Sequence, residues 1–102
     1  MYKVEFLASA KDDMLQIANY ISNDLYNPTA AMKLIAKLEN AKNSLKQFPL
    51  THPKHESDTV ETVFRKILVD NYVMFYIVDG DNVYVAFVLH QRQDFDTILE
   101  KF

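Results

Sequence analysis

The sequence predicts a small α+β domain with an N-terminal strand, an antiparallel two-helix hairpin, a three-stranded antiparallel meander and a short C-terminal helix. Two observations predict this order. Apolar residues recur at helical spacing between residues 10 and 48, and they alternate with the period of strands from residue 62 onward. A chain of 102 residues is long enough for one modest core but not for two. We therefore expect a single domain spanning residues 1–102.

The first strand and the first helix follow from local patterns. Residues 2–6 alternate apolar and charged side chains, as does a strand with one buried face. Ser9 can cap a helix that begins at Ala10, and Asp12 and Asp13 then lie in its positively polarised first turn. The apolar side chains of this helix repeat at helical spacing: Met14, Ile17, Ala18, Ile21 and Leu25.

Asn27 and Pro28 end the first helix and begin a second one. Asn is a good N-cap, and Pro loses no hydrogen bond at the first helical position. So short a connection favours two antiparallel neighbours. Periodicity gives the two helices roughly fifteen and twenty residues. One apolar stripe is expected along the second helix: Ala31, Leu34, Leu38, Ala41, Leu45 and Phe48.

Three strands follow a polar loop that covers residues 50–58. Asp70-Asn71 makes the first tight turn, and Gly80, the only glycine of the chain, lies in the second, where a positive φ is often required. Asp94 or Asp96 can cap a last short helix. The central strand, residues 72–78, is apolar on both faces. The hairpin covers one face, and either the last helix or a partner covers the other.

Composition excludes several classes of protein. Apolar residues make up 49% and charged residues 25% of the chain, which is globular composition. No long apolar run and no signal peptide are present, so we expect a cytoplasmic protein without a membrane segment. With no cysteine and three scattered histidines, no metal site is expected, and no residue cluster implies a cofactor.

The charge distribution is uneven along the chain. The net charge is −3, whereas nucleic-acid binders usually carry a basic footprint. The first 55 residues hold seven lysines against five acidic residues, and the remainder holds four basic residues against nine acidic ones. The basic excess of the first part is expected on solvated helix faces.

Several short motifs in this order resemble the ParE/RelE toxin superfamily over nearly the whole chain. The resemblance lies in the helix start at Ala10-Lys11-Asp12-Asp13, the Phe48-Pro49 helix end, the Phe64-Arg65-Lys66 strand start, the Tyr-rich strand from Tyr72 to Tyr76, and the run from Val88 to Asp94 that contains His90 and Arg92. The superfamily has two branches. ParE-like members inhibit DNA gyrase without being hydrolases, and RelE-like members cleave messenger RNA in the ribosome.

RNA cleavage needs a proton acceptor, a proton donor and cations around the phosphate. If the chain is a nuclease, the candidate residues are Arg65, His90 and Arg92, with Lys66 and the loop residues His52, Lys54 and His55 as possible helpers. We expect Arg65 and His90 at comparable positions near the ends of neighbouring strands. The structural alternatives are an ion pair of Arg65 with Asp70 or Asp94, a hydrogen bond from His90 to Asp94 or a carbonyl, and solvated His52 and His55.

The ParE-like branch is favoured for two reasons. The helices are long, as the resemblance implies for gyrase inhibitors, and the acidic sheet half opposes docking into ribosomal RNA. The alternatives are a RelE-like ribosome-dependent endonuclease and an inactive family member.

The resemblance also implies a cognate antitoxin, which folds over the toxin and binds operator DNA, so the toxin reaches DNA only indirectly. Exposed apolar side chains are the expected anchors for an amphipathic helix or an added strand. The candidates are Leu25, Tyr26, Leu50 and Phe95. Phe87 is a further candidate, but the core is its expected place.

Overall fold

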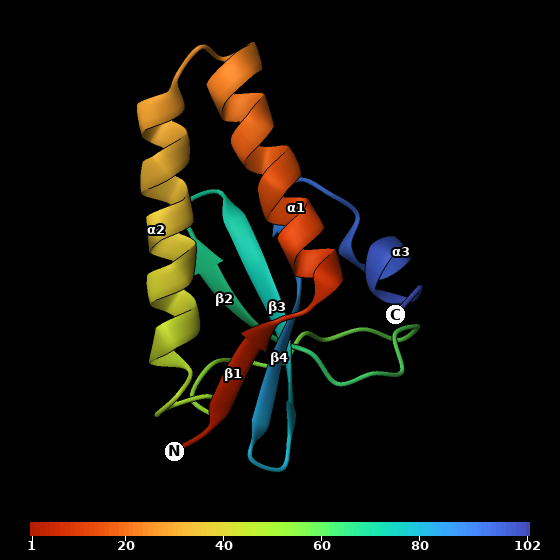
Figure 1. Ribbon diagram of the computed structural model, residues 1–102. Coiled ribbons are helices and arrows are strands. Elements are labelled where there is room, and N and C mark those ends of the chain that lie inside the picture. The colour runs from red at the N-terminus through yellow and green to blue at the C-terminus, as the bar shows by residue number, and fades with distance from the viewer.

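The computed structural model describes all residues 1–102, and its elements follow the predicted order (Figure 1). The elements are β1 (Lys3–Phe6), α1 (Ala8–Asn19), a π-helical turn η1 (Tyr20–Asp24), α2 (Pro28–Ser44), β2 (Arg65–Val69), β3 (Tyr72–Asp79), β4 (Asn82–His90) and α3 (Phe95–Leu99). None of these helices combines the length and the apolar character needed to cross a membrane.

The four strands form one sheet in the order β1-β4-β3-β2. Strands β2, β3 and β4 make the predicted antiparallel meander. The N-terminal strand β1 pairs with β4, and it does so in parallel. The connection between β1 and β4 contains the helical hairpin, β2 and β3, so it is long enough for the crossover that a parallel pair requires. The N-terminal strand is therefore part of the sheet, at the edge opposite to β2.

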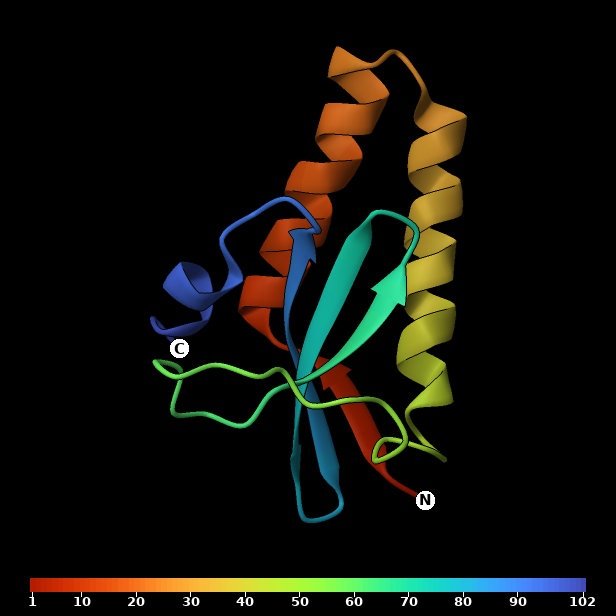
Figure 2. The ribbon, with the colours of Figure 1, turned by 180° about the vertical axis from the view of Figure 1, so that it is seen from behind.

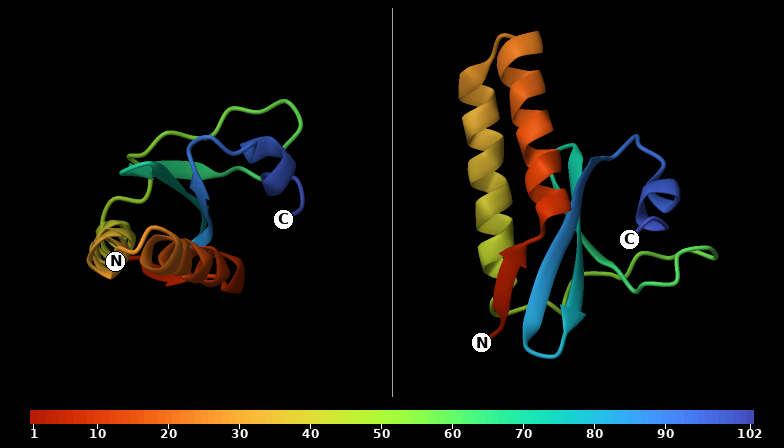
Figure 3. Two further views of the ribbon diagram at one scale, coloured as in Figure 1. Left: turned by 90° about the horizontal axis from the view of Figure 1, so that it is seen from above. Right: turned by 45° about the vertical axis from the view of Figure 1, so that its right-hand side comes forward.

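The sheet separates two apolar clusters. The hairpin packs on one face, and the loop before β2 lies with α3 on the other face (Figures 2 and 3). The larger cluster lies under the hairpin and includes Met14, Leu38 and Tyr76. The smaller cluster contains Phe64, Phe75 and Leu99, which are all almost fully buried. The chain itself thus covers the second face, which settles the alternative left open by the sequence.

Helix α1 begins earlier than the sequence indicated, and Ser9 is not its cap. The N-cap is Leu7, without a side-chain hydrogen bond, and neither Asp12 nor Asp13 lies in the first turn. Instead, Ser9 Oγ donates to the carbonyl of Ala86, and Asp13 Oδ2 accepts from the amide of Val88 at 2.9 Å. These side chains, one helical turn apart, satisfy backbone groups of β4 beyond the point where β1 ends.

In the connection between the two helices, the predicted cap at Asn27 is confirmed, but the π turn at the end of the first helix was not predicted. Asn27 caps α2, because its side-chain oxygen accepts from the amide of Ala30 at 3.1 Å. The first helix, however, ends in the π turn η1, and Tyr26 follows it with a φ of 51°. Such a φ is unusual for a bulky side chain. Both ends of the hairpin connection are therefore set by local backbone geometry.

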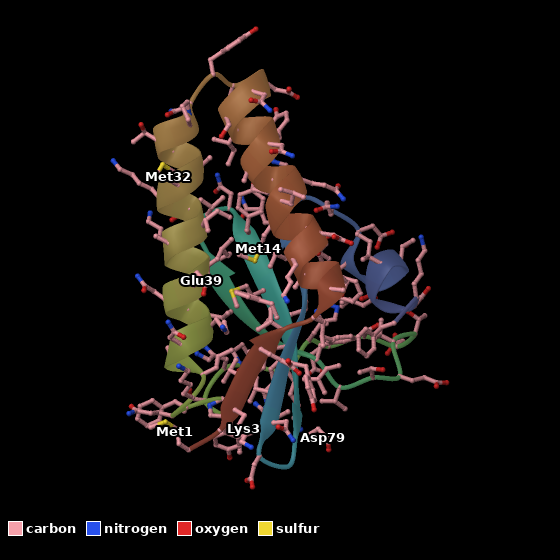
Figure 4. All side chains as sticks on the ribbon, viewed as in Figure 1. Met1, Lys3, Met14, Met32, Glu39 and Asp79 are labelled. Atoms are coloured by element: carbon pink, nitrogen blue, oxygen red, sulfur yellow. The ribbon has the colours of Figure 1, made fainter.

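The prediction of an apolar stripe along α2 is confirmed up to Leu45 and is wrong for Phe48. Ala31, Leu34, Leu38 and Leu45 are buried, whereas Phe48 is 60% exposed because the helix has already ended at Ser44. Met14 points from α1 toward the sheet, while Met32 lies on the outer side of α2 (Figure 4). The two turns of the meander have the expected geometry, with positive φ at Asp70 and Gly80.

Asp13 tests how α1 is held to β4. Partial burial raises the pKa of its carboxyl, and the hydrogen bond from Val88 offsets part of that effect. Since the folded pKa lies above the unfolded value, the folded state binds more protons in the window above pH 3.8, and stability falls as pH rises through the folded pKa.

We expect Asp13→Asn to be at least as stable as wild type at pH 7, because the amide oxygen still accepts from Val88 and carries no charge. Its advantage should shrink as the pH falls toward 4, in urea unfolding followed by circular dichroism. Asp13→Leu, the matched control, leaves the Val88 amide without an acceptor and should lose about 1–3 kcal/mol. Equal stability of Asp13→Leu and wild type would show that the contact is unimportant.

Candidate functional site

The residues named as candidates for RNA cleavage do not all come together. Arg65 begins β2 and is paired with Tyr76 on β3, whereas His90 ends β4 and is paired with Tyr72 on the same strand. Strand β3 lies between the two residues, and they stand about 13 Å apart along the strand direction alone. The expectation that they occupy comparable ends of neighbouring strands is wrong, because β2 and β4 run in the same direction on either side of β3.

Arg65 binds the loop that follows α2. Its Nη1 donates to the carbonyl oxygens of His52 at 2.7 Å and Leu50 at 3.2 Å. It forms no ion pair with Asp70 or Asp94. Asp70 instead binds Lys37 of α2, at 3.1 Å to each carboxylate oxygen. Arg65 therefore fastens the loop that follows α2, and Lys37 connects α2 to the β2–β3 turn.

His90 takes a local structural position. Its Nδ1 accepts from the amide of Arg92 at 3.1 Å, and its ring lies edge-on to Tyr72 with 5.3 Å between the centroids. Its own amide donates to Gln93 Oε1 at 2.7 Å. Neither of the expected partners of the side chain, Asp94 or a carbonyl, is used. Asp94 is the N-cap of α3, since its side chain accepts from the amide of Thr97. Of the two predicted caps, Asp94 and Asp96, Asp94 is thus the one used.

The polar loop suggested a solvated His55, but the side chain of His55 is largely buried. Its Nε2 lies 2.7 Å from Asp96 Oδ1, and its ring contacts Phe75 and Phe95 edge-on. Ser57 Oγ donates to the other oxygen of Asp96 at 2.9 Å. The hydrogen bonds from His55 and Ser57 lower the pKa of Asp96, so their stabilising effect is lost as the pH falls below 3.8. This cluster joins the loop to α3.

A groove lies where the hairpin passes the end of the sheet. We call it the tip groove; it has a volume of about 500 Å³, and its lining includes Tyr20, Ile21, Leu25, Asn71, Tyr72 and His90. Burial raises the pKa of the Tyr72 hydroxyl, and the neighbouring Tyr20 adds to the effect. The π turn and the start of α2 contribute one wall, and the β2–β3 turn with the ends of β3 and β4 contributes the other. The hairpin projects beyond the sheet at this end (Figures 1 and 3).

The rim of the tip groove exposes large apolar side chains. Tyr26 is 88% exposed, and Leu25 and Tyr20 are about half exposed. Tyr26 also has the strained positive φ noted above, and strain of this kind often marks a functional site. This apolar tip has no partner within the chain, so it is a candidate surface for recognising another protein.

The comparison with protein families decides the identity of this fold. The model of the ParE toxin of type II toxin-antitoxin systems, parDE, matches residues 4–95. The chain belongs to the ParE toxin family. The toxin is thus one component of a type II toxin-antitoxin system, and an antitoxin is its partner.

A solved structure is similar to the toxin in fold. It is described as the chromosomal ParDE TA system from P. aeruginosa, and the match covers 88% of the toxin and 96% of that chain with a TM-score of 0.74. The two sequences are 16% identical. No curated protein matches the toxin.

The four predicted antitoxin anchors lie in three places. Leu25 and Tyr26 precede α2 at the tip groove, whereas Leu50 follows α2, which is about 25 Å long. Phe95 begins α3 on the far face of the sheet, where its ring is 5.0 Å from that of Phe75. Phe87 is partly buried against the smaller apolar cluster, as expected. The anchors therefore do not form one continuous patch.

Sequence reasoning missed the contribution of Tyr20 and Tyr72 to the groove. The available signal was Tyr20 itself, a large side chain that falls outside the stripe made by Ile17 and Ile21. A π turn is rare and has no strong sequence signature, so the exposure of Tyr20 beside the sheet could not be foreseen.

Two anchor variants should separate binding from folding. Tyr26→Asp should leave the free energy of unfolding nearly unchanged, because the side chain is exposed, and should weaken antitoxin binding at least about tenfold by desolvating a charge. Phe95→Ala should cost roughly 2 kcal/mol of stability, because its ring packs on Phe75 and His55. Calorimetric titration and urea unfolding of both variants give these values. An unchanged dissociation constant for Tyr26→Asp would remove the tip from the antitoxin surface.

Proposed function

We propose that the toxin acts in the cytoplasm by protein–protein contact with DNA gyrase, through the apolar tip of its hairpin. The observation that carries the proposal is the hairpin tip itself, which extends past the sheet and exposes Tyr20, Leu25 and Tyr26 within one short segment. Two of these three side chains are tyrosines, a residue type that is enriched among binding hot spots.

The same surface suggests how the antitoxin neutralises the toxin. The tip groove adjoins Leu25 and Tyr26 and can take one apolar face of a helix. An antitoxin helix seated there would cover the side chains that gyrase needs. Neutralisation is then competition for one surface, and operator DNA is reached only through the antitoxin.

The nuclease alternative has less support. Arg65 is occupied by two carbonyl groups, and His90 is separated from it by β3. Arg92 follows His90, and its amide donates to the His90 ring. Both residues are therefore at the end of the sheet opposite to Arg65. A single active site built from these three residues would require the sheet to rearrange.

A supercoiling assay with purified gyrase tests the proposal. Wild-type toxin should inhibit supercoiling, and Tyr26→Asp should inhibit it at least about tenfold more weakly because a charge replaces the central apolar contact. Met32→Asp is the matched control, since Met32 is also exposed but lies on the outer side of α2. Met32→Asp should inhibit as strongly as wild type.

Three outcomes would contradict the proposal. Unchanged supercoiling at saturating toxin, with cleavage of translating messages in a parallel reaction, would assign the toxin to the nuclease branch. Equal loss of inhibition in both variants would move the contact away from the tip. Normal growth after induced expression of the wild-type chain would indicate an inactive family member.

A further inference from the structure

Strand β1 forms one edge of the sheet, at the end of the molecule away from the hairpin tip (Figure 1). The amide of Lys3 donates to the carbonyl of Asp81 at 2.8 Å, and that of Leu7 donates to the carbonyl of Val85 at 2.9 Å. Backbone groups alternate in direction along a strand, so the amide and carbonyl of Val4 point away from β4. Neither group takes part in the hydrogen bonds of turns and loops. The outer side of β1 is therefore unpaired at Val4.

Val4 is flanked by two opposite charges on one face of the strand. Val4 and Phe6 pack into the larger apolar cluster under the hairpin. Lys3 and Glu5 therefore lie on the other face, and both side chains are exposed. The chain contains two ion pairs, and neither includes Lys3 or Glu5. The edge thus presents an unpaired cation and an unpaired anion on either side of a free amide and carbonyl.

This pattern is complementary to itself when two copies of β1 run antiparallel. With Val4 of one copy opposite Val4 of the other, the two valines exchange a pair of N–H···O=C bonds. Lys3 of each copy then faces Glu5 of the other, and such cross-strand pairs of opposite charge stabilise a sheet. A shift of the register by two residues would place Lys3 opposite Lys3 or Glu5 opposite Glu5. The charges therefore select one register.

A hollow beside the edge has room for the incoming charged side chain. Its volume is about 260 Å³, and its lining includes Asn82 and Tyr84, which are the ladder partners of Lys3 and Glu5. The aliphatic stem of a lysine can cover an aromatic ring while its ammonium group reaches a charge nearby. A lysine from a second copy can therefore lie against Tyr84 and bind Glu5.

Other ways of pairing this edge are less favourable. Parallel pairing of two β1 strands would set like charges level with each other. The opposite edge of the sheet begins with Arg65 and Lys66, so two copies of that edge would repel each other. Pairing of β1 with β2 of another copy would be heterologous and would extend into an open filament, whereas pairing of β1 with itself is two-fold and closes.

The free edge is short. Strand β1 has four residues, and the amide of Tyr2 already donates to the carbonyl of Lys46 at 3.0 Å. The hydrogen bonds available to a second copy are therefore concentrated at Val4. We expect the interface to bury less than about 1,200 Å², which is the size class of transient contacts.

We propose that the outer edge of β1 binds the same edge of a second toxin molecule, giving a transient two-fold dimer whose sheet continues from one copy into the other. The two-fold axis is perpendicular to the sheet, so both hairpins lie on the same face. The tip of each hairpin lies away from the interface (Figure 1). The dimer leaves both tips free, and the inference does not depend on what the tip binds.

Self-association of the whole toxin is the property to measure. As the concentration rises to about 1 mM, sedimentation should show an equilibrium between monomer and dimer. In nuclear magnetic resonance spectra, the amides of Lys3, Val4 and Glu5 should shift together over the same range, and exchange of the Val4 amide should slow. Higher salt should weaken the association, because the cross-strand ion pairs are exposed.

Charge reversal at the two exposed positions gives the sharpest test. Lys3→Glu and Glu5→Lys should each weaken self-association at least about tenfold, because each turns both cross-strand pairs into pairs of like charge. An equimolar mixture of the two variants should associate as strongly as wild type, since glutamate again faces lysine in both pairs. The double variant with Lys3→Glu and Glu5→Lys should dimerise too. Lys33→Glu, a matched charge reversal at an exposed position of α2, should change nothing.

The proposal is overturned if wild-type toxin stays monomeric at about 1 mM. It is also overturned if the single variants associate as strongly as wild type, or if their mixture fails to associate. Growth into species larger than a dimer would contradict a two-fold contact. Slower exchange of the Val4 amide only when antitoxin is added would assign this edge to the antitoxin instead.

Discussion

The attachment of the N-terminal segment to β4 is the constraint on which the rest of the molecule depends. Strand β1 pairs in parallel with β4, the amide of Leu7 continues the ladder to the carbonyl of Val85, and the side chains of Ser9 and Asp13 then take over. An edge left by a short strand is thus completed by a helix. This arrangement holds α1 at a defined angle over the sheet, and α2 follows because the connection between the helices is short.

The tip groove is a consequence of that attachment. One wall belongs to the π turn and the start of α2, and the other belongs to the turn and strand ends around Asn71 and His90. The ion pair between Lys37 and Asp70 joins α2 to the same end of the sheet. This ion pair is exposed, so it contributes little to the free energy of folding. Its effect is to fix the position of α2 relative to the β2–β3 turn. The surface proposed for partners therefore depends on contacts made at a distance along the sequence.

The order of elements was predictable because apolar periodicity is a local property of the sequence. Asn27 and Gly80 were predictable for the same reason, since a cap and a turn depend on neighbours in the chain. Ser9 and Asp13 were not, because their local signal, a helix start, competes with partners on β4 that only the fold brings near. His55 was judged by its polar neighbours, yet it contacts Asp96 across the sheet face. Arg65 and His90 were misplaced although the meander was predicted correctly, because the start of its first strand and the end of its third strand lie at opposite ends of the sheet.

The central claim is that one surface, the hairpin tip, serves both the target and the antitoxin. Photo-crosslinking from position 26 tests it most directly, because Tyr26 is exposed and carries little of the fold. With a photoreactive residue there, the account predicts a covalent adduct with gyrase that disappears when antitoxin is added first and is replaced by an adduct with the antitoxin. An adduct with gyrase that persists in the presence of bound antitoxin would contradict the account, as would crosslinking to ribosomal components alone.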